Sequence, residues 1–412
     1  MNQSIPSGDI APRNTGSRDR AGSAKRASSK SPDAAIRVTS PVSLLTLVPS
    51  LLGFQPGNSM VIIGIEPPRA RVRLTLRYDL PDPPREHFGP EIVEHALAVL
   101  GAQGITTAVA VGYGPGSLVT PVADAIRAAT ARTGLRVTEL LRAEGDRYWS
   151  YLCSDPVCCP PEGTVFDAAS HAASLAPPGD WPPVLASRAE LAATVAAAEG
   201  EQAELMQAAT CRAEERAARL VARVARSGRT RSGRRLIASA GLEAVAQTVR
   251  RYRRGDQLGA GSAVAWLTVA LRDVRVRDDA WARMDPRYCQ DHVRLWTDVT
   301  RLARPGYAAA PASLLAFVAW QSGNGALANV ALDRALTDNP RYSMAQLLRQ
   351  VIDSGAPPSM ARLPMSPEEV AASYAGLDDD AGQEPGDAPE CPEVSAITAE
   401  EPPPSHAGPH DG

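Results

Sequence analysis

The chain has 412 residues, with 43 basic and 46 acidic side chains, so its formal net charge is only -3. Of the basic residues 41 are Arg, and the two lysines, Lys25 and Lys30, both lie near the N-terminus. A P-loop of the GxxxxGK[ST] type, a kinase-type ATP-binding lysine and a Schiff-base lysine are therefore excluded from the rest of the chain. The sequence also contains no HExxH, GxSxG or paired CxxC motif.

Composition divides the chain into a central body and two charged tails. Residues 1–35 hold six basic and three acidic side chains but almost no apolar ones, so we expect a disordered basic tail. From residue 364 the chain is acidic, with twelve carboxylates and no Lys or Arg over 365–412, and this tail is also expected to be disordered. The expected segments are 1–35 (basic tail), 36–162 (α/β domain), 163–183 (Pro/Gly-rich connector), 184–363 (all-α domain) and 364–412 (acidic tail).

The chain shows no signal for export or membrane insertion. The first 35 residues contain no apolar h-region, and no stretch reaches the roughly 18 consecutive apolar residues that a spanning helix needs. The six cysteines are few and irregularly spaced, which favours reduced thiols over a disulfide framework. We therefore expect a cytoplasmic protein that does not associate with a membrane.

In chain order, the first half alternates strand and helix patterns. Ser40-Pro41 is typical of a helix start, and the alternation of apolar and polar residues over 72–80 is typical of a half-exposed strand. The expected strands are 36–39, 59–65, 72–80, 107–111 and 135–141, and the expected helices are 42–48, 91–100 and 117–133. Strands that alternate with helices predict βαβ units, and therefore an α/β domain with a mixed, partly parallel sheet.

The second half has helical patterns almost throughout, which predicts an all-α domain. The expected helices are 186–198, 202–225, 234–254, 262–271, 278–284, 290–303, 312–321, 326–337 and 343–354. One segment resembles a tetratricopeptide-like helical hairpin, on the spacing of Leu315, Ala316, Gly323, Ala328, Leu332, Ala335 and Pro340. Because such repeats need about three copies to be stable alone, this single hairpin is expected to pack against neighbouring helices.

Four passages together resemble an uncharacterised actinobacterial family, number 4192 in the domain-of-unknown-function series. They are Ser50–Pro56 with Asn58-Ser59, Arg77–Pro81, Trp149–Cys153 with Cys158–Pro160, and Ala319–Gly323 together with Pro340–Ala345. The resemblance covers roughly residues 36–360 and neither tail. It implies a shared fold and no activity.

A cysteine cluster is the first candidate site. Cys153, Cys158, Cys159 and His171 offer four soft or borderline ligands within nineteen residues, and zinc favours four such groups in a tetrahedron. The spacing departs from established zinc motifs, and adjacent cysteines cannot easily both point at one ion. Buried structural thiols are therefore the competing interpretation, and a redox pair of Cys153 with Cys158 is a third.

A glycine loop is the second candidate, for a small ligand. Gly112, Gly114, Gly116 and Ser117 follow an apolar strand and precede a helix, where free backbone N–H groups attract anions. The pattern is G-x-G-x-G rather than G-x-G-x-x-G, and Pro115 removes one donor, so an ordinary strand-to-helix turn is the competing interpretation. Arg77 and Asp79 share one face of a predicted strand and could orient an anionic ligand, or form a structural ion pair.

An arginine stripe is the third candidate. Residues 212–254 hold thirteen Arg against three Glu, and the first of these Arg recur at spacings of four and three, along one side of a helix. Such a stripe is a candidate for binding polyanions, including nucleic acid, although it is also typical of the solvated face of an amphipathic helix. The candidate residues are Arg212, Arg216, Arg219, Arg223, Arg226, Arg234, Arg235, Arg250 and Arg251. The acidic tail could fold back over this stripe and mask it.

No complete catalytic motif accompanies these candidates, and the sequence indicates no cofactor. Our first hypothesis is a non-catalytic cytoplasmic regulatory or scaffold protein that binds a protein partner through its helical domain. The alternatives are an enzyme or sensor that binds a small ligand at residues 112–117, and a nucleic-acid-associated factor that uses the 212–254 stripe. The sequence says nothing about oligomeric state.

Overall fold

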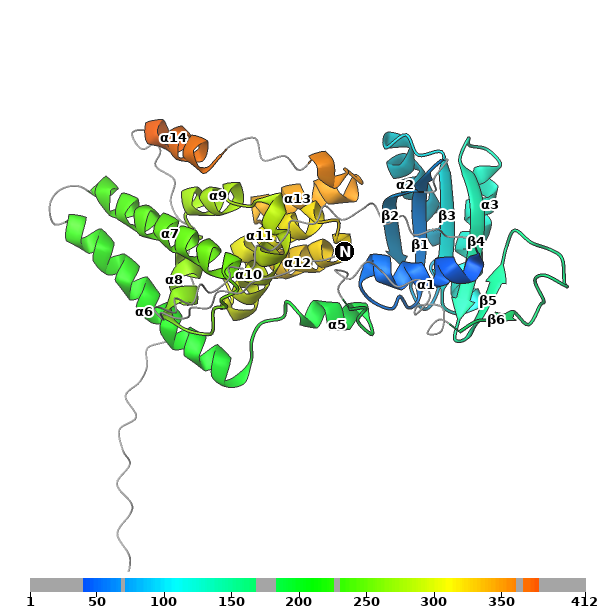
Figure 1. Cartoon of the computed structure of the whole chain (residues 1–412), viewed down its shortest axis with the longest axis horizontal. Helices are drawn as coiled ribbons and strands as arrows, with labels where there is room; N and C mark the ends of the chain where they lie inside the picture. Colours follow the sequence, from blue (N-terminus) through cyan, green and yellow to red (C-terminus); the bar gives the residue numbers. More distant parts are fainter. Residues whose placement is uncertain (1–39, 68–70, 168–182, 226–229, 361–365, 378–412) are drawn as a thin grey trace, which may run out of the picture. The chain divides into compact units, whose positions relative to one another are not determined.

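The computed structural model describes residues 40–67, 71–167, 183–225, 230–360 and 366–377 (Figure 1). The strand expected at 36–39 and most of both tails lie outside these residues. No helix in the described part of the chain is long and apolar enough to cross a membrane.

The N-terminal part is built on a six-stranded sheet in the order β2-β1-β3-β4-β5-β6. The strands are β1 (Ser59–Glu66), β2 (Arg71–Asp79), β3 (Thr107–Tyr113), β4 (Arg136–Glu144), β5 (Arg147–Ser150) and β6 (Thr164–Val165). Within this sheet only β3 and β4 run parallel, and the other neighbouring pairs are antiparallel. The expectation of a mixed, partly parallel sheet is confirmed.

Helices cover both faces of this sheet (Figure 1). Along β1, Met60 and Ile62 join a core that includes residues of α2 (Phe88–Ala102) and α3 (Gly116–Thr130). Val61 and Ile63 point to the opposite face, where their core includes residues of α1 (Pro41–Leu52). This burial on both faces explains why β1 is a continuous apolar run instead of an alternating one.

Helix α1 extends four residues beyond the expected end at Val48. Ser40 caps its start by accepting a hydrogen bond from the backbone N–H of Ser43 at 3.2 Å. It ends at Gly53, which adopts a left-handed φ of 76° and donates its N–H to the carbonyl of Pro49. Pro49 therefore does not terminate the helix, because the buried apolar residues around it keep the last turn packed against the core.

The two short strands at one edge of the sheet were not predicted from the sequence. Gly145, at a φ of 61°, turns the chain from β4 into β5, which pairs with β4 from Leu141 to Glu144. β6 contributes only two residues and pairs with Arg147 and Tyr148. Strands this short are too brief to show an alternation of apolar and polar residues. They nevertheless hold the loop of residues 151–163 between them.

The C-terminal part is helical, as expected. Its helices are α5 (Arg188–Ala193), α6 (Gly200–Ala225), α7 (Thr230–Arg253), α8 (Ser262–Ala270), α9 (Val274–Ala282), α10 (Cys289–Leu302), α11 (Ala309–Gln321), α12 (Gly325–Asp338), α13 (Ser343–Asp353) and α14 (Pro367–Leu377). Short 3-10 segments occur at Pro286–Tyr288 and Pro358–Met360. Helix α5 is shorter than the expected 186–198, and α14 lies in a stretch for which composition predicted no order.

Helices α11 and α12 form the expected hairpin. Gly323 takes a left-handed φ of 82° at the turn, and the side chains of Ala328 and Ala335 are completely buried. Small side chains at these positions let the two helices approach closely. Helix α11 is buried on all sides, so this hairpin packs against neighbouring helices instead of standing alone.

Candidate metal centre

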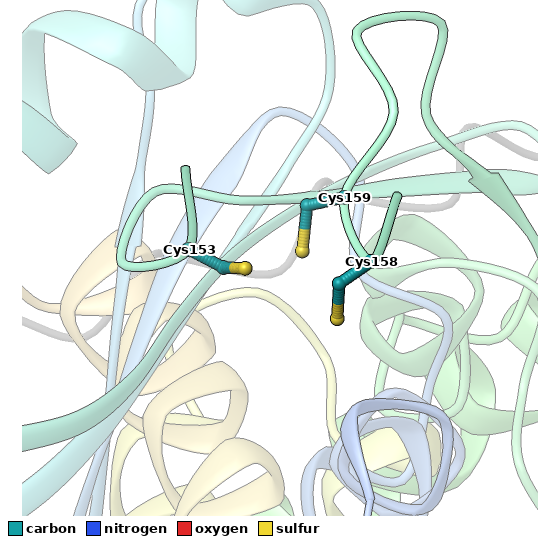
Figure 2. Close-up of side chains that lie close together, drawn as sticks. All are labelled: Cys153, Cys158 and Cys159. Atoms are coloured by element: carbon teal, nitrogen blue, oxygen red, sulfur yellow. The ribbon is translucent and has the colours of Figure 1, made fainter. Parts of the chain in front are cut away.

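The loop between β5 and β6 brings three cysteine side chains together. The Sγ atoms of Cys153, Cys158 and Cys159 all lie within 4.8 Å of one another. Figure 2 shows the three sulfur atoms gathered around a common space. We call this group the thiol cluster. Cys158 and Cys159, although adjacent in the sequence, both contribute a sulfur atom to this group.

Turn hydrogen bonds explain this convergence. The hydroxyl of Ser150 accepts hydrogen bonds from the backbone N–H groups of Leu152 and Cys153, each at 3.3 Å, which turns the chain as it leaves β5. The backbone carbonyl of Asp155 then accepts a hydrogen bond from the N–H of Cys159 at 2.7 Å, closing one helix-like turn. Because this turn curls the chain back, it brings the sulfur atoms of Cys158 and Cys159 close to that of Cys153.

The far end of the loop is fixed to the sheet. The indole N–H of Trp149 donates to the carbonyl of Pro161 at 2.9 Å, and Arg147 donates to the carbonyl of Gly163 at 2.9 Å. The guanidinium of Arg142 stacks on the Trp149 ring, 3.6 Å from its centroid. The thiol cluster is therefore held by a loop that is anchored at both ends.

The three thiols differ in exposure and in acidity. Cys158 is exposed, whereas Cys153 and Cys159 are half-buried, and all three are free thiols. A hydrogen bond between Cys153 and Cys159 lowers the pKa of Cys153 and raises the pKa of Cys159 to about 12. Thiolate sulfur is a soft ligand that suits Zn²⁺ and Cu⁺. No described histidine or carboxylate joins the cluster, and His171 lies outside the described residues.

Two further cysteines on described helices have different states. Cys289 of α10 is a half-buried free thiol. Cys211 of α6 is disulfide-bonded, so the expectation of reduced thiols is wrong at that position.

The glycine loop has a packing role in the structure. A Cβ atom at Gly112 would overlap the side chain of Val119, so the absence of a side chain lets α3 lie against β3. A Cβ at Gly116 would lie 2.9 Å from Nη1 of Arg142, and Gly114 has a φ of 126°. Ser117 is exposed in the first turn of α3. Phosphate binding at this loop stays a prediction.

Arg77 and Asp79 form an ion pair at 2.5 Å between Nη2 and Oδ1. The pairing of β2, β1 and β3 places Asp79, Ser59 and Tyr113 in one row across the sheet. The hydroxyl groups of Ser59 and Tyr113 are buried without a hydrogen-bond partner in the described part of the chain. Neither of two hollows in the structure is lined by a residue of this row. One is a groove on α6 and α7, and the other is a small cavity between the sheet and α2.

The predicted arginine stripe lies on α6 and α7. Six of its arginines are exposed: Arg212, Arg216, Arg219, Arg223, Arg235 and Arg250. Arg251 is half-buried. Arg234 lies in α7, but its side chain is not described, and Arg226 falls outside the described residues. Several are neutralised locally, as Arg219 pairs with Glu215 at 3.2 Å and Arg250 with Glu243 at 3.5 Å. Polyanion binding by this stripe is not tested by the structure.

The groove on α6 and α7 was not predicted from the sequence. It has a volume of about 630 Å³ and is open to solvent. Helix α6 supplies Arg216 and Leu220, the residue after α9 supplies Arg283, and the remaining lining comes from α7. Leucines beside arginines in the sequence of these helices were the available signal for a groove. The sequence does not show, however, that α6 and α7 pack against each other.

Residues 41–359 match a family model described as Domain of unknown function (DUF4192). The chain belongs to this family. The match includes the whole sheet, the thiol cluster and helices α1 to α13, and it leaves out α14 and both tails. The resemblance found in the sequence is therefore confirmed, and the family description assigns no activity. No curated protein and no solved structure matches the chain.

Proposed function

We propose that this member of the family binds one Zn²⁺ ion through the thiolates of Cys153, Cys158 and Cys159, as a non-catalytic regulatory protein. The observation that carries the proposal is the convergence of three Sγ atoms within 4.8 Å, supplied by one seven-residue segment. Three free thiols at such distances are a recognisable donor set for a thiophilic cation.

The sulfur spacing fits zinc after a small adjustment. With Zn–S bonds of about 2.3 Å and tetrahedral angles, ligand sulfurs lie about 3.8 Å apart. The separations in the thiol cluster, all within 4.8 Å, exceed that value by at most about 1 Å. Side-chain rotation closes such a gap, because Cys158 is exposed and free to adopt another rotamer.

The exposure of the cluster supports a regulatory role for the ion. Structural zinc sites are closed by four protein ligands, whereas this cluster supplies three from one surface loop. The fourth position is then taken by water or by a side chain outside the described residues, for which His171 is our candidate. An ion with an open fourth position is accessible to a further ligand, which gives a route by which ligand binding could regulate the protein.

Metal analysis of the full chain tests this proposal. Protein purified without chelator should carry one zinc per chain, and each of Cys153→Ser, Cys158→Ser and Cys159→Ser should lower zinc affinity at least tenfold in competition with a chromogenic chelator. Cys289→Ser is the matched control, because Cys289 is a free, half-buried thiol on α10, outside the cluster. It should leave affinity unchanged.

Two outcomes would overturn the zinc site. One is equal zinc affinity in the three cluster variants and in Cys289→Ser. The other is a chain that binds no zinc when reduced and forms a disulfide within the cluster under mild oxidation, which would assign the thiols to redox chemistry.

The helical part supports a second role, as an interaction domain for a protein partner. The observation in its favour is the open groove on α6 and α7, which combines apolar side chains with arginines. Pull-down of one partner by the full chain, lost on Leu236→Asp, would support this role, and Leu205→Asp on the exposed face of α6 is the control. Equal recovery by both variants would argue against it.

A further inference from the structure

Cys158 is the most accessible residue of the thiol cluster. It is exposed, whereas Cys153 and Cys159 are half-buried. The four residues between Cys153 and Cys158 are exposed as well, and Val157 is 93% exposed. Because oxidation of a cysteine follows the exposure of its sulfur, an oxidant in solution meets Cys158 first.

Backbone geometry decides which sulfur can form a disulfide with Cys158. The two Cα atoms of a disulfide usually lie about 4.4–6.8 Å apart, whereas adjacent Cα atoms across a trans peptide bond lie about 3.8 Å apart. A bond between the adjacent Cys158 and Cys159 would therefore distort the chain. The third member of the cluster, Cys153, has its Sγ atom within 4.8 Å of the Sγ atom of Cys158 and carries no such restriction.

The loop permits a bond between Cys153 and Cys158 after a small movement. Disulfide sulfurs lie about 2.05 Å apart, so the two Sγ atoms have to approach each other by at most about 3 Å. Rotation of the exposed Cys158 side chain to another rotamer supplies such a movement without loss of core packing. The ends of the loop stay fixed by the hydrogen bonds of Ser150 and by the bond from Trp149 to Pro161.

This disulfide removes two of the three thiolates that bind the zinc ion. A thiolate is the form of cysteine that binds a metal, so the two sulfurs of a disulfide no longer serve as ligands. Cys159 is then the one thiolate left in the cluster, and no described histidine or carboxylate joins it. One protein ligand does not hold an ion that favours four donors. Zinc binding and the disulfide therefore exclude each other.

We propose that the thiol cluster is a redox switch, in which a hydroperoxide links Cys153 to Cys158 and thereby releases the zinc ion. The inference rests on the zinc site proposed above and adds the regulation of that site. In the reduced chain the three thiolates hold zinc, and in the oxidised chain the zinc is free in solution.

The reaction balances in two steps. The thiolate of Cys158 attacks one peroxide oxygen, the O–O bond breaks, and the departing oxygen takes up a proton from solvent, which gives an alcohol, or water from hydrogen peroxide. The thiolate of Cys153 then attacks the sulfenic acid on Cys158. The S–S bond forms, the S–O bond breaks, and the departing hydroxide takes up a second proton to become water. The two sulfurs lose two electrons, and the peroxide gains them.

Peroxide treatment of the zinc-loaded full chain tests the switch. Zinc content after desalting should fall at least tenfold, and two thiols per chain should be lost. A phosphine, which cleaves the disulfide and becomes a phosphine oxide, should restore the thiols and, with added zinc, the zinc content. Cys289→Ser is the matched control, because Cys289 is a free, half-buried thiol outside the cluster, and it should release zinc as wild type does.

Peptide mapping without reductant locates the bond in the metal-free, oxidised chain. Trypsin leaves the three cluster cysteines in one peptide, residues 148–188, and acid cleavage of the Asp-Pro bond before Pro156 separates Cys153 from the other two. The two halves should stay linked in wild type and equally in Cys159→Ser. In Cys158→Ser the linked fraction should be at least tenfold lower.

The outcomes separate the switch from the zinc site. Zinc that stays bound in peroxide, zinc loss that the phosphine does not reverse, or an equal linked fraction in Cys158→Ser and wild type would each overturn the switch and leave the zinc site standing. A reduced chain that binds no zinc before any peroxide is added would overturn the zinc site, and the switch with it.

Discussion

The indole ring of Trp149 covers Gly163 so closely that a Cβ atom there would lie 2.5 Å from the ring. Gly163 also has a left-handed φ of 84°, which side chains rarely adopt. These two constraints fix where the loop of the thiol cluster returns to β6. The geometry of the cluster thus depends on a contact between a strand residue and a glycine fourteen positions later.

Gly163→Ala should therefore loosen the loop and weaken zinc binding. The added methyl group displaces Trp149 and forces an unfavourable φ, at a cost of about 1–3 kcal/mol. Chelator competition should show at least a tenfold loss of zinc affinity. Gly134→Ala is the matched control, because that glycine has open space around it and no positive φ. An unchanged affinity in Gly163→Ala would show that the loop anchor does not position the thiols.

Gly112→Ala should destabilise the fold by about 1–3 kcal/mol, because its methyl group overlaps Val119 and pushes α3 from the sheet. The double variant Gly112→Ala, Val119→Ala should recover part of this loss, since the smaller side chain makes room. Urea unfolding measures both. If the two substitutions prove additive, with no interaction energy between them, the overlap with Val119 is not the source of the loss.

His292 should make the folded state sensitive to acid. Its side chain is 1% exposed, and burial lowers its pKa to about 4, with Arg253 adding to the effect and Asp285 opposing it. The folded pKa lies below the unfolded value near 6.5, so the unfolded chain takes up a proton at this histidine before the folded chain does. The free energy of unfolding is therefore highest above pH 6.5 and falls as the pH is lowered toward 4. The shift corresponds to about 3 kcal/mol.

The difference between wild type and His292→Gln isolates this effect. Urea unfolding at pH 7.5, 5.5 and 4.5 should show a smaller loss of stability in the variant, because glutamine does not titrate and can accept the hydrogen bond from the N–H of Asp285. Parallel pH profiles for the two proteins would contradict the prediction, since other groups titrate equally in both.

Asp338 should stabilise the start of α11 although it lies at the end of α12. Its carboxylate accepts backbone hydrogen bonds from Gly306, Ala308 and Ala309 at 2.7, 2.8 and 3.0 Å. A negative charge at a helix N-terminus satisfies its free N–H groups and its dipole. Asp338→Ala should cost about 1–2 kcal/mol in thermal or urea unfolding. Asp124→Ala, which removes only a surface ion pair, should cost clearly less.

Much of the fold could be read from local patterns. The apolar run at 59–65 predicted β1 closely, because a strand buried on both faces is apolar throughout, and the alternation at 72–80 predicted β2, because a strand with one exposed face repeats every two residues. The helix predicted to end at Val48 continues through Pro49 to Leu52, since a proline ends a helix only when no packing compensates for its lost hydrogen bond. β5 and β6 escaped prediction because they are held by cross-strand pairing and not by any pattern of their own.

The sequence by itself determined the mixed sheet, the helical second part, the opposite charges of the tails and the membership of the family. It also named Cys153, Cys158 and Cys159 as a candidate site. Only the tertiary structure decided that adjacent cysteines face a common point, that Gly112 makes room for Val119 and that α6 and α7 enclose a groove. Periodicity is a local property of the chain, whereas turn hydrogen bonds and contacts between distant segments depend on how the whole chain packs.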